Sequence, residues 1–95
     1  MEAHPAVTFR DGPAGRRPAL RGGPDLWEVI STLQVNRGSV AAAATHLALP
    51  ERDIRAALDY YGDHPTEIDD WIRTNAEEAE RGRLAWERQR AIARE

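Results

Sequence analysis

His46, Asp59, Asp63 and His64 are the residues whose types could bind a metal ion. Imidazole nitrogens and carboxylate oxygens are common ligands of divalent metals, and Asp59 and Asp63 have the i, i+4 spacing of one helix face. Gly62 lies between these two aspartates and predicts the end of a helix, which would separate them. We therefore expect surface or capping roles for these residues, and we predict neither a metal site nor a cofactor.

Ser39, Thr45 and His46 bring hydroxyl groups and an imidazole close together in the sequence, as nucleophilic catalysis would require. Such a site also needs an acid that orients the base and donors that stabilise an oxyanion, and the sequence indicates neither. The glycine-rich stretches "DGPAG" and "RGGP" lack the lysine and the spacing of a phosphate-binding loop, so they are interpreted as turns. We predict no catalytic residues and no enzymatic activity.

Arginine offers the clearest binding chemistry, because all 13 basic residues are arginine. Guanidinium groups bind phosphates and base edges, so we predict that Arg52 and Arg55 contact DNA. Arg16 and Arg17 lie in an amino-terminal arm and are candidates for contacts to phosphate or to a minor groove, with a solubilising role as an equal alternative.

Helices with a 3.6-residue apolar period must position these arginines. The first helix is predicted over residues 26–37, after an acidic capping box of Asp25 and Glu28 and before a stop at Gly38. Its apolar side chains recur at the spacing of a single face: Leu26, Val29, Ile30 and Leu33. Such a stripe predicts that this helix is buried along one side.

The second and third helices are predicted over residues 39–48 and 50–61. Ser39 should cap the second helix, whose alanines allow a neighbouring helix to approach closely. Pro50 suits the first position of the third helix and Gly62 its end. The inward face of the third helix carries Ile54, Ala57, Leu58 and Tyr61, and its outward face carries Glu51, Arg52, Arg55, Ala56 and Asp59.

Two helices joined by a short break, with one more helix before them, are typical of a helix-turn-helix. Residues 1–24 form an arm in which Val7–Arg10 and Pro18–Leu20 predict a β-hairpin. The expected fold is all-α: a tri-helical, homeodomain-like helix-turn-helix over residues 25–72, the hairpin arm, and a long C-terminal helix over residues 73–95. A simple helical bundle without DNA contact remains the alternative.

The C-terminal segment combines high charge with isolated large apolar side chains. A cap of Thr66 and Asp69 predicts the start of this fourth helix, and Gly82 interrupts its pattern. A polar helix with isolated apolar residues usually has a partner or frays. The alternative is a solvated helix in which Glu77 pairs with Arg81 and Glu80 with Arg83. The candidates for partner binding are Leu84, Arg83, Trp86, Arg88, Arg90, Ile92 and Arg94.

Composition limits where the chain can work and how it is stabilised. The net charge is −3, there is no cysteine, and no apolar run approaches a membrane span, so we expect a cytoplasmic protein that binds no membrane. A core of this size stabilises a fold weakly, which favours self-association or a partner. We expect a homodimer in which Val7, Phe9 and Leu20 of the arm pair across the interface.

The segments "GRRPALRGGPDLWEVI" and "GSVAAAATHLALPERDIRAALDYYGDHPTEIDDWI" resemble a widespread bacterial family of small helix-turn-helix proteins, formerly a domain of unknown function and now regarded as VapB-type antitoxin-like. The resemblance covers roughly residues 7–72. It lies in the glycine-flanked "RPALRGG", the small-residue second helix, and the third helix over residues 54–61. Members usually have Thr-Arg after the second glycine, where this chain has Pro24.

This resemblance implies the antitoxin of a type II toxin–antitoxin system, whose partners are operator DNA and a PIN-like ribonuclease toxin. It implies that the C-terminal helix blocks a carboxylate-rich, metal-binding active site, with Trp86, Leu84 and Ile92 as apolar anchors and Arg88 and Arg90 among the delivered charges. Two alternatives stay open: a stand-alone repressor, and a dimeric adaptor that does not bind DNA.

Overall fold

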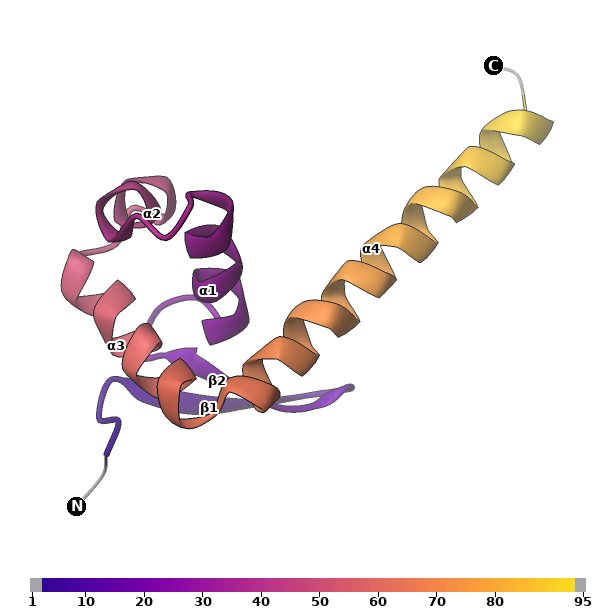
Figure 1. The fold of residues 1–95 in the computed structure, drawn as a ribbon. Coiled ribbons are helices and arrows are strands. Elements are labelled where there is room, and N and C mark those ends of the chain that lie inside the picture. The colour runs from indigo at the N-terminus through magenta and orange to yellow at the C-terminus, as the bar shows by residue number, and fades with distance from the viewer. Residues whose placement is uncertain (1–2, 94–95) are drawn as a thin grey trace.

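A computed structural model describes residues 3–93 and shows a mostly helical protein with an N-terminal hairpin and a long C-terminal helix (Figure 1). The hairpin and the first three helices form a globule, and the last helix leaves it, so the longest dimension is 56 Å. The elements are β1 (Val7–Gly12), β2 (Gly15–Leu20), α1 (Leu26–Val35), α2 (Val40–Leu47), α3 (Glu51–Asp63) and α4 (Pro65–Ile92).

The predicted hairpin is confirmed, and its strands are longer than expected because pairing continues up to the turn. The strands are antiparallel in a register that runs from Val7 opposite Leu20 to Gly12 opposite Gly15. Gly15 has φ +116°, a conformation that favours glycine. Val7 and Leu20 are buried in the chain's own core, so the prediction that they pair across a dimer is wrong. Phe9 remains 41% exposed.

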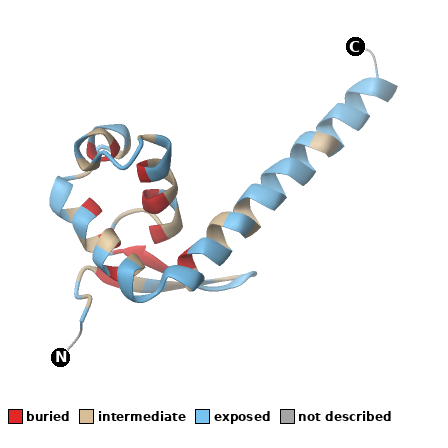
Figure 2. Ribbon diagram, in the orientation of Figure 1, coloured by how far each residue is buried: buried red, intermediate tan, exposed pale blue. Residues whose placement is uncertain are grey.

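The core lies where the hairpin and the four helices meet. Figure 2 shows buried residues on the inward faces of α1 to α3, on the hairpin and at the start of α4, whereas the rest of α4 is exposed. The predicted face of α1 is confirmed. The buried apolar residues are Val7, Ala19, Leu20, Leu26, Val29, Ile30, Leu33, Ala43, Ala44, Ile54, Ala57, Tyr60 and Ile68.

The start of α1 differs from the prediction. Asp25 occupies the N-cap position, but its side chain makes no capping hydrogen bond, so the predicted capping box is wrong. The carboxylate instead accepts hydrogen bonds from the hairpin, as described below. Helix α1 ends two residues earlier than predicted, because Arg37 and Gly38 have φ of 56° and 81° and turn the chain away.

Helices α2 and α3 form the helix-turn-helix pair. The Ser39 cap is confirmed: its Oγ accepts a hydrogen bond of 3.1 Å from the amide of Ala42. Ala43 and Ala44 are buried, as close helix packing requires. Ala48 ends α2 in the left-handed region with φ 55°, a position that costs a residue with a Cβ about 1 kcal/mol. Pro50 is the N-cap of α3, not its first helical residue.

The predicted end of α3 at Gly62 is wrong, because the helix continues to Asp63. A single glycine lowers helix propensity without breaking a helix that packs against its neighbours. The chain leaves the helical conformation only at His64, the residue before Pro65, where the proline ring disfavours helical geometry.

Helix α4 begins at Pro65 and runs without interruption through Gly82, so the predicted Thr66–Asp69 cap is wrong. The Asp69 carboxylate instead accepts a hydrogen bond of 2.9 Å from the Tyr61 hydroxyl. The first turns of α4 pack on the globule through Ile68, which is fully buried. The structure therefore confirms the long C-terminal helix and places its second half outside the globule (Figure 1).

Candidate functional site: the outer surface of α3 and the projecting half of α4

Two of the predicted DNA contacts lie at the exposed start of α3. Arg52 and Arg55 are three residues apart, on the side opposite the buried Ile54 and Ala57. The Arg55 side chain is 66% exposed and its Nη2 lies 3.8 Å from a carboxylate oxygen of Glu51. Both guanidinium groups can therefore reach a ligand, and only a weak surface ion pair holds Arg55.

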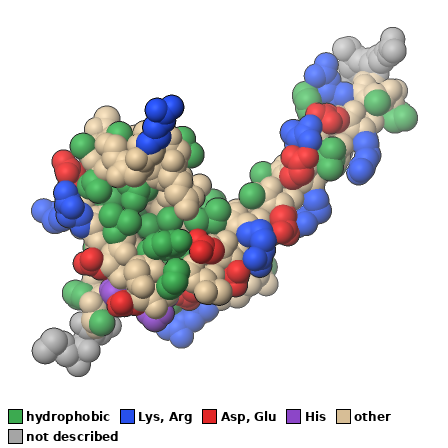
Figure 3. All heavy atoms as spheres, in the orientation of Figure 1, with side chains coloured by type: hydrophobic (Ala, Val, Ile, Leu, Met, Phe, Trp, Pro, Cys, Tyr) green, Lys and Arg blue, Asp and Glu red, His purple; other side chains and the backbone are tan. Residues whose placement is uncertain are grey.

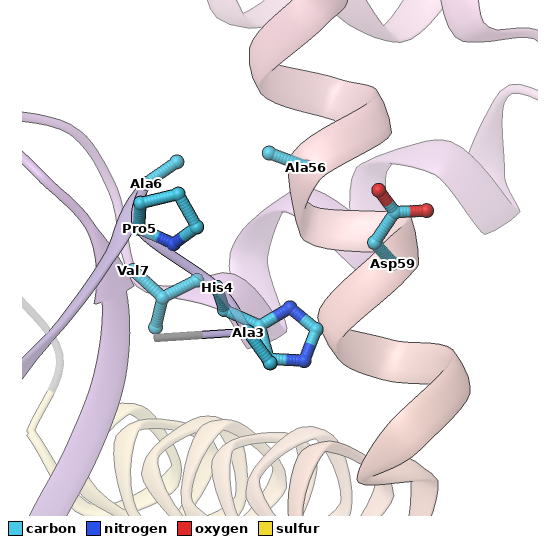
Figure 4. A pocket seen from close by; sticks show the side chains of 7 residues that line it. All are labelled: Ala3, His4, Pro5, Ala6, Val7, Ala56 and Asp59. Carbon is cyan, nitrogen blue, oxygen red and sulfur yellow. The ribbon is translucent and has the colours of Figure 1, made fainter. Parts of the chain in front are cut away.

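The N-terminal segment, residues 3–7, lies beside the second half of the outer surface of α3. Figure 4 shows Ala56 and Asp59 facing this segment across a small hollow that His4 also lines. Its volume of about 190 Å³ is below the range of typical small-molecule sites. The segment thus lies beside Ala56 and Asp59 of the predicted recognition surface, where Asp59 stays exposed, and the arginine-bearing start of α3 is open.

His4 joins the N-terminal segment to the end of α3. Its Nε2 lies 2.8 Å from an Asp63 carboxylate oxygen, and its ring packs edge-on against Tyr60 with 5.0 Å between centroids. The Tyr60 hydroxyl donates a 2.5 Å hydrogen bond to Glu67 at the start of α4. Burial, and next this hydrogen bond, raise the pKa of Tyr60 well above its ordinary value. This cluster joins three elements, and sequence reasoning missed it.

The arm arginines already have partners inside the chain. Both belong to β2 of the arm. Arg16 lies over the Phe9 ring, with 4.2 Å between its guanidinium carbon and the centroid. Arg17 Nε donates a 2.7 Å hydrogen bond to Asp25. These contacts indicate that both arginines stabilise the hairpin. The predicted contact of either residue with DNA stays a prediction.

Asp25 is the hub of the hairpin–helix junction. Its carboxylate accepts hydrogen bonds from Arg17, from Arg10 at 3.4 Å and from the Trp27 indole at 3.2 Å. Arg10 and Arg17 lie opposite each other in the hairpin register, which brings both guanidinium groups to one acceptor. Arg10 and Arg17 were the sequence signal for this junction, but the sequence does not show that they face each other until the register of the hairpin is known.

The predicted partner-binding side chains lie on the projecting half of α4. Trp86 and Ile92 are 55% and 88% exposed, and Leu84 is half-buried. Arg90 lies over the Trp86 ring at 4.7 Å. Figure 3 shows charged side chains of both signs along this half, with hydrophobic side chains between them. Arg94, also predicted to bind the partner, lies outside the described residues.

The apolar anchors do not share a face of α4. Successive residues of an α-helix are rotated by about 100°, so Leu84 and Trp86 lie on nearly opposite sides. Leu84, Arg88 and Ile92 follow one another at i, i+4 spacing along one side. The structure therefore divides the predicted set into a Leu84 face and a Trp86 face.

Ion pairs within α4 hold several of its charges. The Glu80–Arg83 pair expected for the solvated-helix alternative is present, and Arg83 also contacts Glu87 at 2.5 Å. The Glu77–Arg81 pair of the solvated-helix alternative is replaced by another, because Glu77 lies 3.7 Å from Arg73. The hydrogen bond from Arg83 lowers the pKa of Glu80, but these exposed pairs add little stability.

The residues weighed as metal ligands are dispersed. His46 contacts the Asn36 side chain at 3.3 Å, Asp63 contacts His4, and His64 packs against Tyr60. Within residues 3–93, no three histidine or acidic side chains are grouped as metal ligands. The same part of the chain contains no helix that is long and apolar enough to cross a membrane.

Comparison with protein-family models, with curated proteins and with solved structures finds no match to this chain.

Proposed function

We propose that this protein is the antitoxin of a type II toxin–antitoxin system, which represses its own operon through α2 and α3 and neutralises a PIN-like ribonuclease through the projecting half of α4. The single observation that carries the proposal is the division of the molecule into a helix-turn-helix globule and an exposed helix with anchor-like side chains. The sequence resemblance to VapB-type antitoxins points to the same two activities.

The DNA-binding half is supported by the open start of α3. Recognition helices contact base edges with their N-terminal residues, and Arg52 and Arg55 occupy that part of α3. We expect Arg52→Ala or Arg55→Ala to weaken operator binding by about 1–3 kcal/mol and Arg16→Ala to weaken it less. A gel-shift titration with the promoter of the protein's own operon measures this. Unchanged operator affinity in both the Arg52→Ala and the Arg55→Ala variants would reject the assignment of α3 as the recognition helix.

The toxin-binding half is supported by the chemistry of the projecting helix. An exposed indole and aliphatic side chains, flanked by arginines, suit a hydrophobic groove beside a cluster of catalytic carboxylates. Deletion of residues 80–95 should abolish neutralisation when the chain is co-expressed with the adjacent toxin gene, while operator binding persists. Neutralisation by the shortened chain would exclude the helix as the inhibitor.

The adaptor alternative is favoured by a different observation. Four acids, Glu51, Asp53, Asp59 and Asp63, accompany two arginines on α3, and residues 3–7 lie beside the second half of that helix. If the promoter fragment is not shifted at low salt, where phosphate contacts are strongest, the adaptor explains the globule better than a repressor does.

A further inference from the structure

Two arginines of the globule have guanidinium groups that no other group of the chain holds. The other arginines of the globule contact a carboxylate, the Phe9 ring or a backbone carbonyl. Among residues 3–64, Arg37 and Arg52 alone make no hydrogen bond, ion pair or ring contact through their side chains. Arg52 is already a predicted DNA contact. Arg37 is exposed in the turn between α1 and α2, and the proposed function so far gives it no role.

The backbone at Arg37 is unfavourable for a residue with a Cβ. Arg37 follows Asn36, the C-cap of α1, and has φ 56°, in the left-handed region where helices usually place glycine. Gly38 comes one residue later, and its amide donates a hydrogen bond to the carbonyl of Leu33. No side-chain contact of Arg37 within residues 3–93 offsets the cost of this backbone conformation. A strained residue whose side chain is free in its own chain indicates a contact with another molecule.

The stretch of chain around Arg37 carries no carboxylate. No aspartate or glutamate occurs between Glu28 and Glu51, which is the longest acid-free stretch of a chain whose net charge is −3. This stretch includes most of α1, the turn at Arg37 and all of α2. The exposed side chains of α2 are Ala41, Thr45 and His46. None of them carries a negative charge, so the segment led by Arg37 suits a polyanion such as DNA.

We propose that Arg37 binds a phosphate of the DNA backbone and thereby fixes the position of α3 on the operator. This inference rests on the proposed DNA binding and adds to it a contact outside α3. A guanidinium group can bind the oxygens of one phosphate through two parallel hydrogen bonds. In a helix-turn-helix, the helix before the recognition helix crosses the DNA backbone, and α2, which follows Arg37, has that place in the chain.

The two free arginines have different tasks in this arrangement. Phosphate contacts fix the register of a protein on DNA and carry no sequence information, whereas contacts to base edges distinguish sequences. Arg37 therefore supports binding to any duplex, and Arg52 at the start of α3 supports the preference for the operator. Because α3 carries four acids and two arginines, Arg37 supplies attraction to the DNA backbone that α3 itself lacks.

Fluorescence-anisotropy titrations of the full chain test the contact, with the promoter duplex and an unrelated duplex of equal length, each at several salt concentrations. We expect Arg37→Ala to weaken binding to both duplexes by about tenfold at low salt and to lower the salt slope of the affinity by about 1. Arg37→Lys should keep the wild-type slope, because it keeps the charge. Arg81→Ala is the matched control, since Arg81 is also exposed and without a partner among the described residues but lies on α4, and it should change neither quantity.

A variant with glycine separates DNA binding from folding. Arg37→Gly should unfold at a higher urea concentration than the wild type, because glycine relieves the left-handed backbone, and it should bind DNA as weakly as Arg37→Ala. Loss of DNA binding only together with the fold would overturn the proposal.

The titrations also distinguish this inference from the proposed function. Promoter binding that both Arg37 changes leave intact, or that Arg81→Ala weakens equally, would overturn the phosphate contact alone. A loss confined to the promoter duplex, with an unchanged salt slope, would do the same. A wild-type chain that binds neither duplex would overturn both the contact and the DNA-binding half of the proposed function.

Discussion

A single carboxylate joins the hairpin to the first helix. Asp25 was expected to cap α1, and its position at the N-cap is correct. What the side chain does there depends on Arg10 and Arg17, which reach it only because the hairpin register places them opposite each other. A local sequence pattern predicts a hydrogen bond from a nearby backbone amide to the Asp25 carboxylate. It does not include the two arginine side chains, which are stronger, charged donors and which only the fold brings close to this carboxylate.

We expect Asp25→Ala to lower the free energy of unfolding by about 2–3 kcal/mol, because it leaves Arg10, Arg17 and the Trp27 indole without their shared acceptor. Asp25→Asn keeps an acceptor and should cost less. Urea unfolding measures both. Asp11→Ala, at an exposed position on the same hairpin, is the control, and equal losses for Asp11 and Asp25 would contradict this account.

The two tyrosines should make stability depend on alkaline pH. The chain has no lysine or cysteine, so Tyr60 and Tyr61 are the side chains that titrate between pH 9 and 11. Burial and the Glu67 hydrogen bond raise the pKa of Tyr60, and the hydrogen bond to Asp69 raises that of Tyr61. The folded state therefore holds protons that the unfolded chain releases, and stability should fall as the pH rises above about 10.

Urea unfolding at several pH values between 8 and 11 measures this dependence. Tyr60→Phe should flatten it, and Tyr61→Phe, which removes a more exposed hydroxyl, should flatten it less. An unchanged slope in Tyr60→Phe would show that burial of this hydroxyl is not its source.

At the level of elements, the apolar periodicity predicted the buried faces correctly, whereas the ends of several helices were predicted incorrectly. The face of α1, the cap at Ser39 and the hairpin follow from local patterns, and the structure confirms them. Gly62 and Gly82 were taken as helix breaks, yet both lie within helices. Glycine marks a helix end when the chain needs a positive φ there, as at Gly38, and the sequence alone does not show which glycines meet that condition.

These two kinds of glycine should respond oppositely to alanine. Gly62→Ala should raise the free energy of unfolding by about 0.5–1 kcal/mol, since a Cβ there meets nothing within 4 Å and the backbone is helical. Gly38→Ala should lower it by about 1 kcal/mol, because its φ of 81° is strained for any residue with a Cβ. Thermal and urea unfolding of the two variants test the pair. Changes of the same sign would contradict the assignment.

For the whole molecule, the fold class followed from the sequence, whereas the separation of the exposed α4 side chains onto a Leu84 face and a Trp86 face did not. The apolar residues of α4 predicted a helix that binds a partner. Their positions on two faces could be assigned only because the structure shows that the helix is continuous through Gly82. The arm was expected to dimerise, yet Val7 and Leu20 complete the core of their own chain. A globule of this size uses nearly every large apolar side chain near it.

The globule should fold without the projecting half of α4. The buried residues end at Ile68, so deletion of residues 80–95 should change the free energy of unfolding by less than about 0.5 kcal/mol at low protein concentration. The circular dichroism signal at 222 nm should fall in proportion to the helix removed. Loss of cooperative unfolding in the shortened chain would show that the helix supports the globule.

The long, one-sided shape distributes the three tryptophans over three settings. Trp27 donates to a carboxylate at the hairpin junction, Trp71 is half-buried at the base of the last helix, and Trp86 stands in solvent near its tip. Their intrinsic fluorescence should therefore report three events separately. With two of the indoles replaced in turn, the emission of the third gives an optical signal for the junction, for the base of the helix, or for any molecule that covers its tip.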